Sequence, residues 1–222
     1  MALAMLGGVV PASRTLHVLE IIKAGILNGD LAEGQPLVEA EIANELGVSK
    51  TPVREALKSL EGTGLVVIRP YTGAVVRTFT KDDALAIYDI RLLLEPEAVR
   101  RTVALRGDFS SASHALADAA AAGEYSKRSI ANRDFHRALY AGCGNPLLVQ
   151  TLDGLRDQTA LVSVSSWARD ASWDDEASEH RQILDAAERG AADTCAELVA
   201  RHIKDFTDRR IRPIADGGAA KI

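Results

Sequence analysis

The stretch Gly47–Glu61, GVSKTPVREALKSLE, predicts a helix with two chemically different faces. Apolar residues recur at three- and four-residue spacing, which places them on one side: Val53, Ala56, Leu57 and Leu60. Cations at i, i+4 and i+8 make another side basic: Lys50, Arg54 and Lys58. Ser49 or Thr51 can cap the helix, and Pro52 is tolerated in its first turn. Such a helix suits a major groove, although a solvated basic face on a core helix explains the pattern equally well.

The composition describes a globular chain. Its 222 residues, 47% of them apolar, are enough for two modest domains or one large one. Cys143 and Cys195 are too far apart for a metal Cys pair and fit no disulfide framework, so we expect a reducing compartment. The apolar first ten residues lack a basic segment, and no run approaches 18 apolar residues. We therefore expect a cytoplasmic protein without a membrane segment.

Charge alone argues weakly against nucleic acid, because the net charge is -5. The local distribution differs, since Lys50–Lys58 holds three cations and one acid while the preceding segment is acidic. A basic patch on one helix can bind phosphates within an acidic protein. The sequence therefore leaves DNA binding open.

The chain around this stretch has the order of a winged helix-turn-helix. Residues 14–28 and 39–46 predict two helices, and Gly47 is the turn before the third. Two β-prone runs follow, Leu65–Ile68 and Ala74–Phe79, which predict a hairpin. Arg69 and Gly73 at its tip can reach DNA, although a plain hairpin closing the small core explains them equally well.

The remainder predicts helices only. Amphipathic segments separated by Gly, Pro or Asn lie near 82–105, 110–122, 125–141, 146–168, 174–189 and 191–210. We predict a mainly α fold, with a winged helix-turn-helix at 10–79, an all-helical bundle at 80–214 and a disordered tail at 215–222.

These segments resemble a known family. LVEAEIANELGVSKTPVREALKSLEGTGLV and RPYTGAVV are similar to GntR-type winged helix-turn-helix regulators. IYDIRLLLEPEAV, NRDFHRALYAGCGNPLL and EHRQILDAAERGAADTCAELVARHI look like the FCD effector domain of the FadR branch. The resemblance covers roughly residues 14–212, and about six helices suit the shorter VanR-like subgroup.

The resemblance implies a homodimeric regulator that binds a palindromic double-stranded DNA operator and responds to a small carboxylate effector. The expected DNA contacts are Ser49, Lys50, Thr51, Arg54, Lys58, Arg69 and Gly73. Lys50 stands where the family most often has Arg, so it offers a point charge in place of a fork. Ala40 stands where some relatives have an Arg. Arg54 is the best candidate for reading a base.

Three histidines occupy separate predicted helices: His136, His180 and His202. Asn132 lies one turn before His136 on the same helix. Imidazoles suit Zn, Ni, Cu or Fe, but their long spacings are no local metal motif, and ordinary hydrogen-bonded histidines explain each one singly. The resemblance implies a divalent metal ion, Zn, Ni or similar, held by Asn132 and these histidines in the pattern D/N-x-x-F-H … H … H. Asn in place of Asp removes a charge, so we expect weaker binding.

Arg91 has two interpretations. It can pair with Glu95 one turn later, or it can bind an effector carboxylate beside the metal, as the resemblance implies. A metalloenzyme is the alternative function, since three histidines and an amide also build hydrolytic sites. That alternative lacks an obvious companion base, because Asp134 is predicted to point elsewhere on the helix than His136, and Glu179 is not on the same face as His180. A purely structural dimerisation module would leave the basic helix face without a role. We therefore predict a ligand-responsive repressor.

Overall fold

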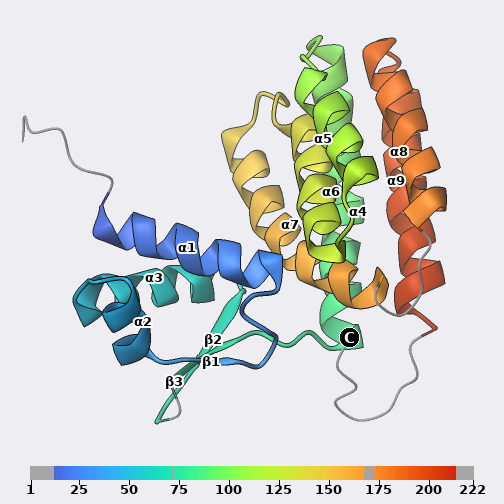
Figure 1. Ribbon diagram of the computed structural model, residues 1–222. Helices are drawn as coiled ribbons and strands as arrows, with labels where there is room; N and C mark the ends of the chain where they lie inside the picture. The colour runs from blue at the N-terminus through green and yellow to red at the C-terminus, as the bar shows by residue number, and fades with distance from the viewer. Residues whose placement is uncertain (1–12, 72, 168–172, 214–222) are drawn as a thin grey trace, which may run out of the picture. The chain divides into compact units, whose positions relative to one another are not determined.

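The computed structural model describes residues 13–71, 73–167 and 173–213, which form two compact units, Met1–Arg77 and Thr78–Ile222 (Figure 1). Each unit is described by itself. The tail predicted at 215–222 lies outside the described residues. No helix in the described ranges is long and apolar enough to cross a membrane.

The first unit is a winged helix-turn-helix. Its elements are α1 (Arg14–Asn28), β1 (Pro36–Leu37), α2 (Glu39–Glu45), α3 (Lys50–Gly62), β2 (Val66–Arg69) and β3 (Gly73–Val76). The strands form an antiparallel sheet in the order β1-β3-β2, with Val67 opposite Val75 in the hairpin. Strand β2 is shifted by one residue from its predicted position, and β3 is shorter than predicted. Strand β1 was not predicted, because two residues carry no periodicity.

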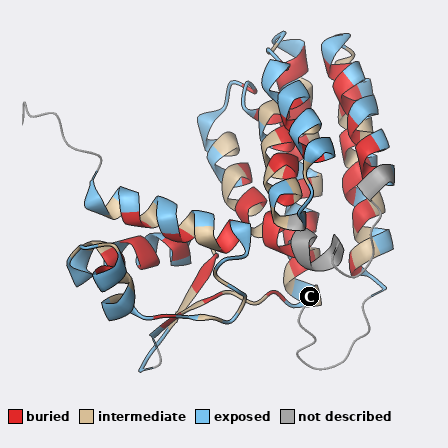
Figure 2. Ribbon diagram, in the orientation of Figure 1, coloured by how far each residue is buried: buried red, intermediate tan, exposed pale blue. Residues whose placement is uncertain are grey.

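Local sequence sets the ends of the helices in this unit. The Ser13 hydroxyl accepts a hydrogen bond from the Leu16 amide and caps α1, and Gly29 ends that helix with a positive φ of 82°. The apolar stripe of α3 is buried at Val53, Ala56, Leu57 and Leu60, each at most 1% exposed. Burying this stripe against the rest of the unit leaves the basic side of α3 in solvent (Figure 2).

The second unit is a bundle of long helices. They are α4 (Lys81–Ala104), α5 (Ser110–Ala121), α6 (Tyr125–Tyr140), α7 (Pro146–Trp167), α8 (Trp173–Glu188) and α9 (Ala192–Phe206), followed by the π-helix η1 (Thr207–Ile211). The last predicted helix therefore ends earlier than residue 210 and changes its hydrogen-bond pattern. Helix α4 packs against α6, α7 and α9, which makes it central to the bundle. A reciprocal Thr80–Asp83 capping box fixes its start.

Candidate functional site

The basic side of α3 is the first candidate site. All of the residues predicted to touch DNA are exposed: Ser49, Lys50, Thr51, Arg54, Lys58, Arg69 and Gly73. A hollow of about 500 Å³ lies between α3 and the wing, and its lining includes Arg54, Lys58 and Gly73. Tyr71, fully exposed with a positive φ of 68°, borders the same hollow. The unit thus presents cations, hydroxyls and a wing tip on its surface.

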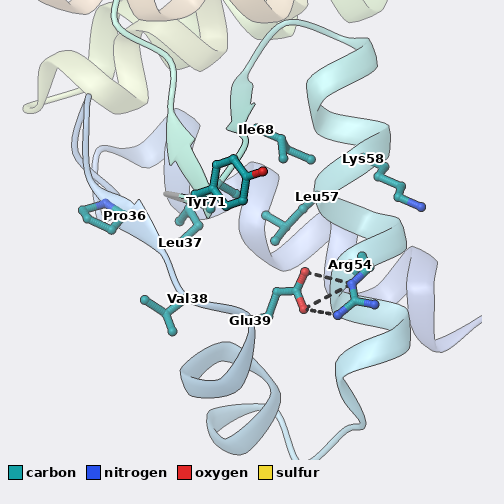
Figure 3. Close-up of a pocket in the computed structure, with 11 residues that line it drawn as sticks. Pro36, Leu37, Val38, Glu39, Arg54, Leu57, Lys58, Ile68 and Tyr71 are labelled. Atoms are coloured by element: carbon teal, nitrogen blue, oxygen red, sulfur yellow. Dashed lines mark hydrogen bonds and ion pairs between the residues drawn. The ribbon is translucent and has the colours of Figure 1, made fainter.

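Arg54 is held by a carboxylate from the preceding helix. Its Nε lies 3.0 Å from Glu39 Oε1 and its Nη2 lies 2.8 Å from Glu39 Oε2, a two-point contact between α3 and α2 (Figure 3). The hydrogen bond from Arg54 lowers the pKa of Glu39. This two-point contact fixes the orientation of the guanidinium plane. A fixed orientation favours two simultaneous hydrogen bonds to the edge of a base. Glu39 belongs to the acidic segment noted before this helix, but helical periodicity did not predict its pairing with Arg54.

The second candidate site lies inside the helical bundle. The structure brings together His136 of α6, His180 of α8 and His202 of α9, with one ligand nitrogen from each within 4.8 Å of the others. All three side chains are buried, and the Nε2 atoms of His180 and His202 lie 3.2 Å apart. Two nitrogens that each bond an ion at about 2.1 Å lie roughly 3 Å apart, so this spacing fits a metal ion. Convergence of the three helices agrees with the prediction.

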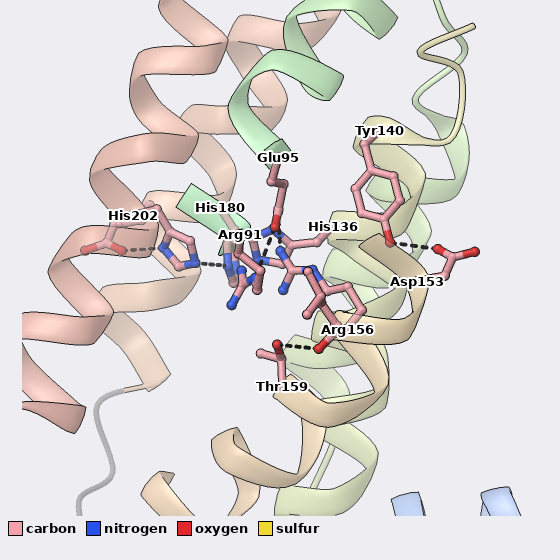
Figure 4. Close-up of polar contacts among 11 residues, drawn as sticks. Arg91, Glu95, His136, Tyr140, Asp153, Arg156, Thr159, His180 and His202 are labelled. Atoms are coloured by element: carbon pink, nitrogen blue, oxygen red, sulfur yellow. Dashed lines mark hydrogen bonds and ion pairs between the residues drawn. The ribbon is translucent and has the colours of Figure 1, made fainter. Parts of the chain in front are cut away.

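Carboxylates orient two of these imidazoles. The Nδ1 of His136 lies 2.8 Å from Glu95 Oε1, and the Nδ1 of His202 lies 2.7 Å from Glu179 Oε2 (Figure 4). A carboxylate only accepts hydrogen bonds, so each Nδ1 carries the proton and each Nε2 offers a lone pair. Glu179, which the sequence places next to His180 but not on the same helix face, therefore binds the imidazole of a different helix, a contact that was not predicted.

Burial keeps the imidazoles suited to a metal. Loss of hydration lowers the pKa of His136 and His180 well below the ordinary value, so both are neutral at physiological pH. Asn132 Oδ1 and His136 Nε2 are buried and have no hydrogen-bond partner. The unpaired His136 nitrogen and Asn132 oxygen, one turn apart on α6, are lone pairs that a divalent cation can bind, so the residues present fit the predicted ion.

Behind the histidines, Glu95 joins two buried arginines. It is 0% exposed and accepts hydrogen bonds from Arg91 Nε at 3.1 Å, from Arg156 Nη2 and from His136. Burial alone would raise the pKa of Glu95, but the charges of Arg156 and Arg91 outweigh it and hold that pKa well below the usual range. Arg91 also lies over the ring of Tyr88, 4.5 Å from its centroid. The predicted Arg91–Glu95 pair is therefore present.

Arg156 was missed, since no local pattern marks a lone Arg on α7. It is 2% exposed, and its Nε is buried without a partner. Burial and the neighbouring charge of Arg91 lower the pKa of Arg156 to about 10. The negative charge around the Arg156 guanidinium thus does not fully compensate its burial and the charge of Arg91.

Asp134, a candidate base in the enzyme alternative, instead binds Arg133 at 2.9 Å.

Comparisons with known proteins cover both units. Residues 14–76 match the model described as bacterial regulatory proteins, gntR family, and residues 86–205 match the FCD domain. A Paenarthrobacter nicotinovorans protein named "Probable D-xylose utilization operon transcriptional repressor" is 32% identical, over 86% of this chain and 85% of its own. The gluconate operon transcriptional repressor of Bacillus subtilis is 39% identical over 41% of this chain and 37% of its own.

Solved structures show the same architecture. A GntR transcriptional regulator from Rhodococcus sp. RHA1 superposes with a TM-score of 0.82 at 25% identity, over 91% of this chain and 99% of that chain. McbR/YncC of E. coli gives a TM-score of 0.76 at 24% identity, covering 88% and 96% of the two chains, which supports the fold alone. The mainly helical fold with a winged helix-turn-helix in front is thereby confirmed.

Proposed function

We propose that this chain, which belongs to the GntR family of bacterial regulatory proteins and carries an FCD domain, represses transcription until a small carboxylate binds at a metal ion in its helical unit. Family membership makes the chain a DNA-binding transcriptional regulator and not an enzyme, so the metalloenzyme alternative is set aside. The repressor role, the effector class and the metal are our proposal. It also places the chain in the cytoplasm and in the VanR-like subgroup of the FadR branch.

The exposed cations of α3 support operator recognition by this helix. We assign Arg54, which Glu39 orients, as the residue that hydrogen-bonds a base, and Lys58 as a contact to a backbone phosphate. We expect Arg54→Ala to lose about 1 to 3 kcal/mol of preference for a selected operator over random duplex. Lys58→Ala should weaken both duplexes alike. Fluorescence anisotropy at two salt concentrations separates these outcomes, and an unchanged preference in Arg54→Ala would refute the assignment.

One observation carries the metal proposal: three buried histidine nitrogens lie within 4.8 Å of one another. Asn132, one turn before His136 on α6, adds a buried oxygen without a hydrogen-bond partner. The proposed ligands are Asn132, His136, His180 and His202. When bound, the ion supplies a positive charge to which an effector carboxylate can coordinate. Glu95 and Glu179 keep two imidazoles in the ligating tautomer, and all three imidazoles are buried.

Elemental analysis of purified protein tests this site. With all proteins purified in acetate buffer, we expect about one equivalent of a divalent transition metal in the wild type and in His114→Ala, whose imidazole is exposed on α5. His136→Ala and His180→Ala should lose that metal. Equal metal content in all four proteins would remove the site from the proposal.

A palindromic operator requires a protein with two-fold symmetry, so the proposal includes a homodimer. Light scattering at micromolar concentration should give twice the chain mass of 23.7 kDa. A monomer with undiminished operator affinity would contradict the dimer without affecting the metal site.

A further inference from the structure

We infer that the metal ion and the anionic effector of this site bind as a pair, and that the site holds neither one firmly alone. This inference rests on the proposed function, because it concerns the regulation of the same site. It assigns to Asn132 and Arg156 the roles that make each ligand depend on the other. The structural basis is the charge of the buried donors, together with the hydrogen-bonding atoms that they leave unpaired.

The site gives a cation no negative charge of its own. A metal-bound imidazole is neutral, and so is the Asn132 amide, so the four proposed ligands together carry no charge. The carboxylates that bind the histidines are already paired: Glu95 with Arg91 and Arg156, and Glu179 with Arg209 at 2.5 Å. The Glu179–Arg209 pair is neutral and partly exposed, so the fully buried charges are +2 from Arg91 and Arg156 and -1 from Glu95, a net +1. A divalent ion would raise this to +3 in a buried place, which is unfavourable without a counterion.

The unpaired atoms show which partners the site lacks. Asn132 Oδ1 and His136 Nε2 are buried acceptors without a donor, and Arg156 Nε is a buried donor without an acceptor. A cation satisfies the two acceptors but repels Arg156. An anion satisfies Arg156 but gains nothing from the other two. Only a cation and an anion together satisfy all three, which is the condition for positive coupling between the two ligands.

This arrangement makes the effector an anion that supplies the charge missing from the ligand set. A carboxylate has the required chemistry, since it offers one oxygen for a cation and a second oxygen that can accept from Arg156 Nε. An aspartate in place of Asn132 would supply the same charge from the protein and would end the dependence on the anion. Methionine in place of Arg156 would remove one positive charge and the unpaired Nε donor while keeping much of the side-chain volume.

The experiment measures the Zn²⁺ dissociation constant by competition with a chelator dye, in a carboxylate-free buffer and again with acetate. We expect acetate to tighten Zn²⁺ binding by the wild type about tenfold or more. Asn132→Asp and Arg156→Met should each bind Zn²⁺ at least as tightly without acetate as the wild type does with it, and acetate should change neither. Circular dichroism melts establish that both variants fold, and each tests the coupling independently.

The outcomes separate the inference from the proposal beneath it. Tight Zn²⁺ binding by the wild type without acetate, equal to that of Asn132→Asp, would overturn the coupling and leave the metal site standing. A wild-type dissociation constant that acetate does not change would overturn it as well. Zn²⁺ binding that is equally weak in the wild type, Asn132→Asp and His180→Ala would instead remove the metal site itself.

Discussion

Replacing Glu95 with Gln tests whether the buried carboxylate holds the helical unit together. The substitution keeps the size of the side chain and removes its charge. In the structure Glu95 accepts from Arg91 Nε, Arg156 Nη2 and His136 Nδ1 while fully buried. A neutral amide leaves two buried guanidinium groups without a counter-charge. Its NH₂ group also faces the N–H donors of neighbouring side chains, to which the carboxylate oxygen was an acceptor. We therefore expect a large loss of stability.

Removing one partner from a buried ion pair costs about 3 to 5 kcal/mol, and this value applies because no group here reaches more than 2% exposure. Glu97→Gln is the matched control, on the same helix with the same chemical change. Glu97 is 41% exposed and pairs with Arg100 and Arg101 at the surface. Its ion pairs are hydrated in both the folded and unfolded chains, so its loss should be a small fraction of the loss at Glu95.

Urea unfolding followed by tryptophan fluorescence measures the difference, because Trp167 and Trp173, the chain's only tryptophans, both belong to the helical unit. With a slope of about 2 kcal/mol per molar urea, the midpoint of Glu95→Gln should fall by about 1.5 to 2.5 M. The midpoint of Glu97→Gln should stay near the wild type. Equal midpoints for the two variants would refute the reasoning that the charge of Glu95 stabilises the bundle.

The stability of the helical unit should depend on pH because the pKa of Glu95 differs between the folded and unfolded chains. The arginines hold the folded pKa of Glu95 well below its unfolded value of about 4.3. A depressed folded pKa contributes stability that is complete above the unfolded pKa and is lost as pH falls toward the folded value. The free-energy difference between the wild type and Glu95→Gln should therefore be constant above about pH 5 and shrink below it.

Three further outcomes concern the winged unit. Glu39→Gln should reduce discrimination between operator and random duplex, because Arg54 loses its orienting partner. It should also raise affinity for random duplex, because the surface loses a negative charge. Fluorescence anisotropy with both duplexes measures these effects, and unchanged discrimination would contradict the role of Glu39. Gly47→Ala should destabilise the unit by about 1 kcal/mol in thermal melts because φ is +63° there, although no atom lies within 4 Å of the new Cβ. Leu57→Ala should cost about 2 to 5 kcal/mol, since Leu57 is 1% exposed in the core; a smaller loss than that of Gly47→Ala would show a core able to collapse around the cavity.

The sequence predicted the helices well because their signals are local. Caps, turn glycines and apolar stripes act within a few residues, so α1 and α5 begin and end within a residue of their predicted bounds. The convergence of His136, His180 and His202 came from the family pattern and not from spacing. The contacts of Glu39, Arg156 and Glu179 join separate helices, and helical periodicity carries no information about which distant side chain a polar group will meet. Only the i, i+4 pair of Arg91 and Glu95 was within reach of sequence reasoning.

The contacts of Glu95 also set an order of events in time. Its partners His136 and Arg156 lie 41 and 61 positions further along the chain. Helices form within about a microsecond, whereas at about 5 to 20 residues per second a ribosome needs roughly 3 to 12 seconds to add those 61 residues. Throughout that interval the carboxylate must stay hydrated, because burying it beside Arg91 alone would leave most of its hydrogen bonds unmade. We therefore expect burial of α4 to wait for α7, so that the bundle closes around its charges only after most of its chain has been made.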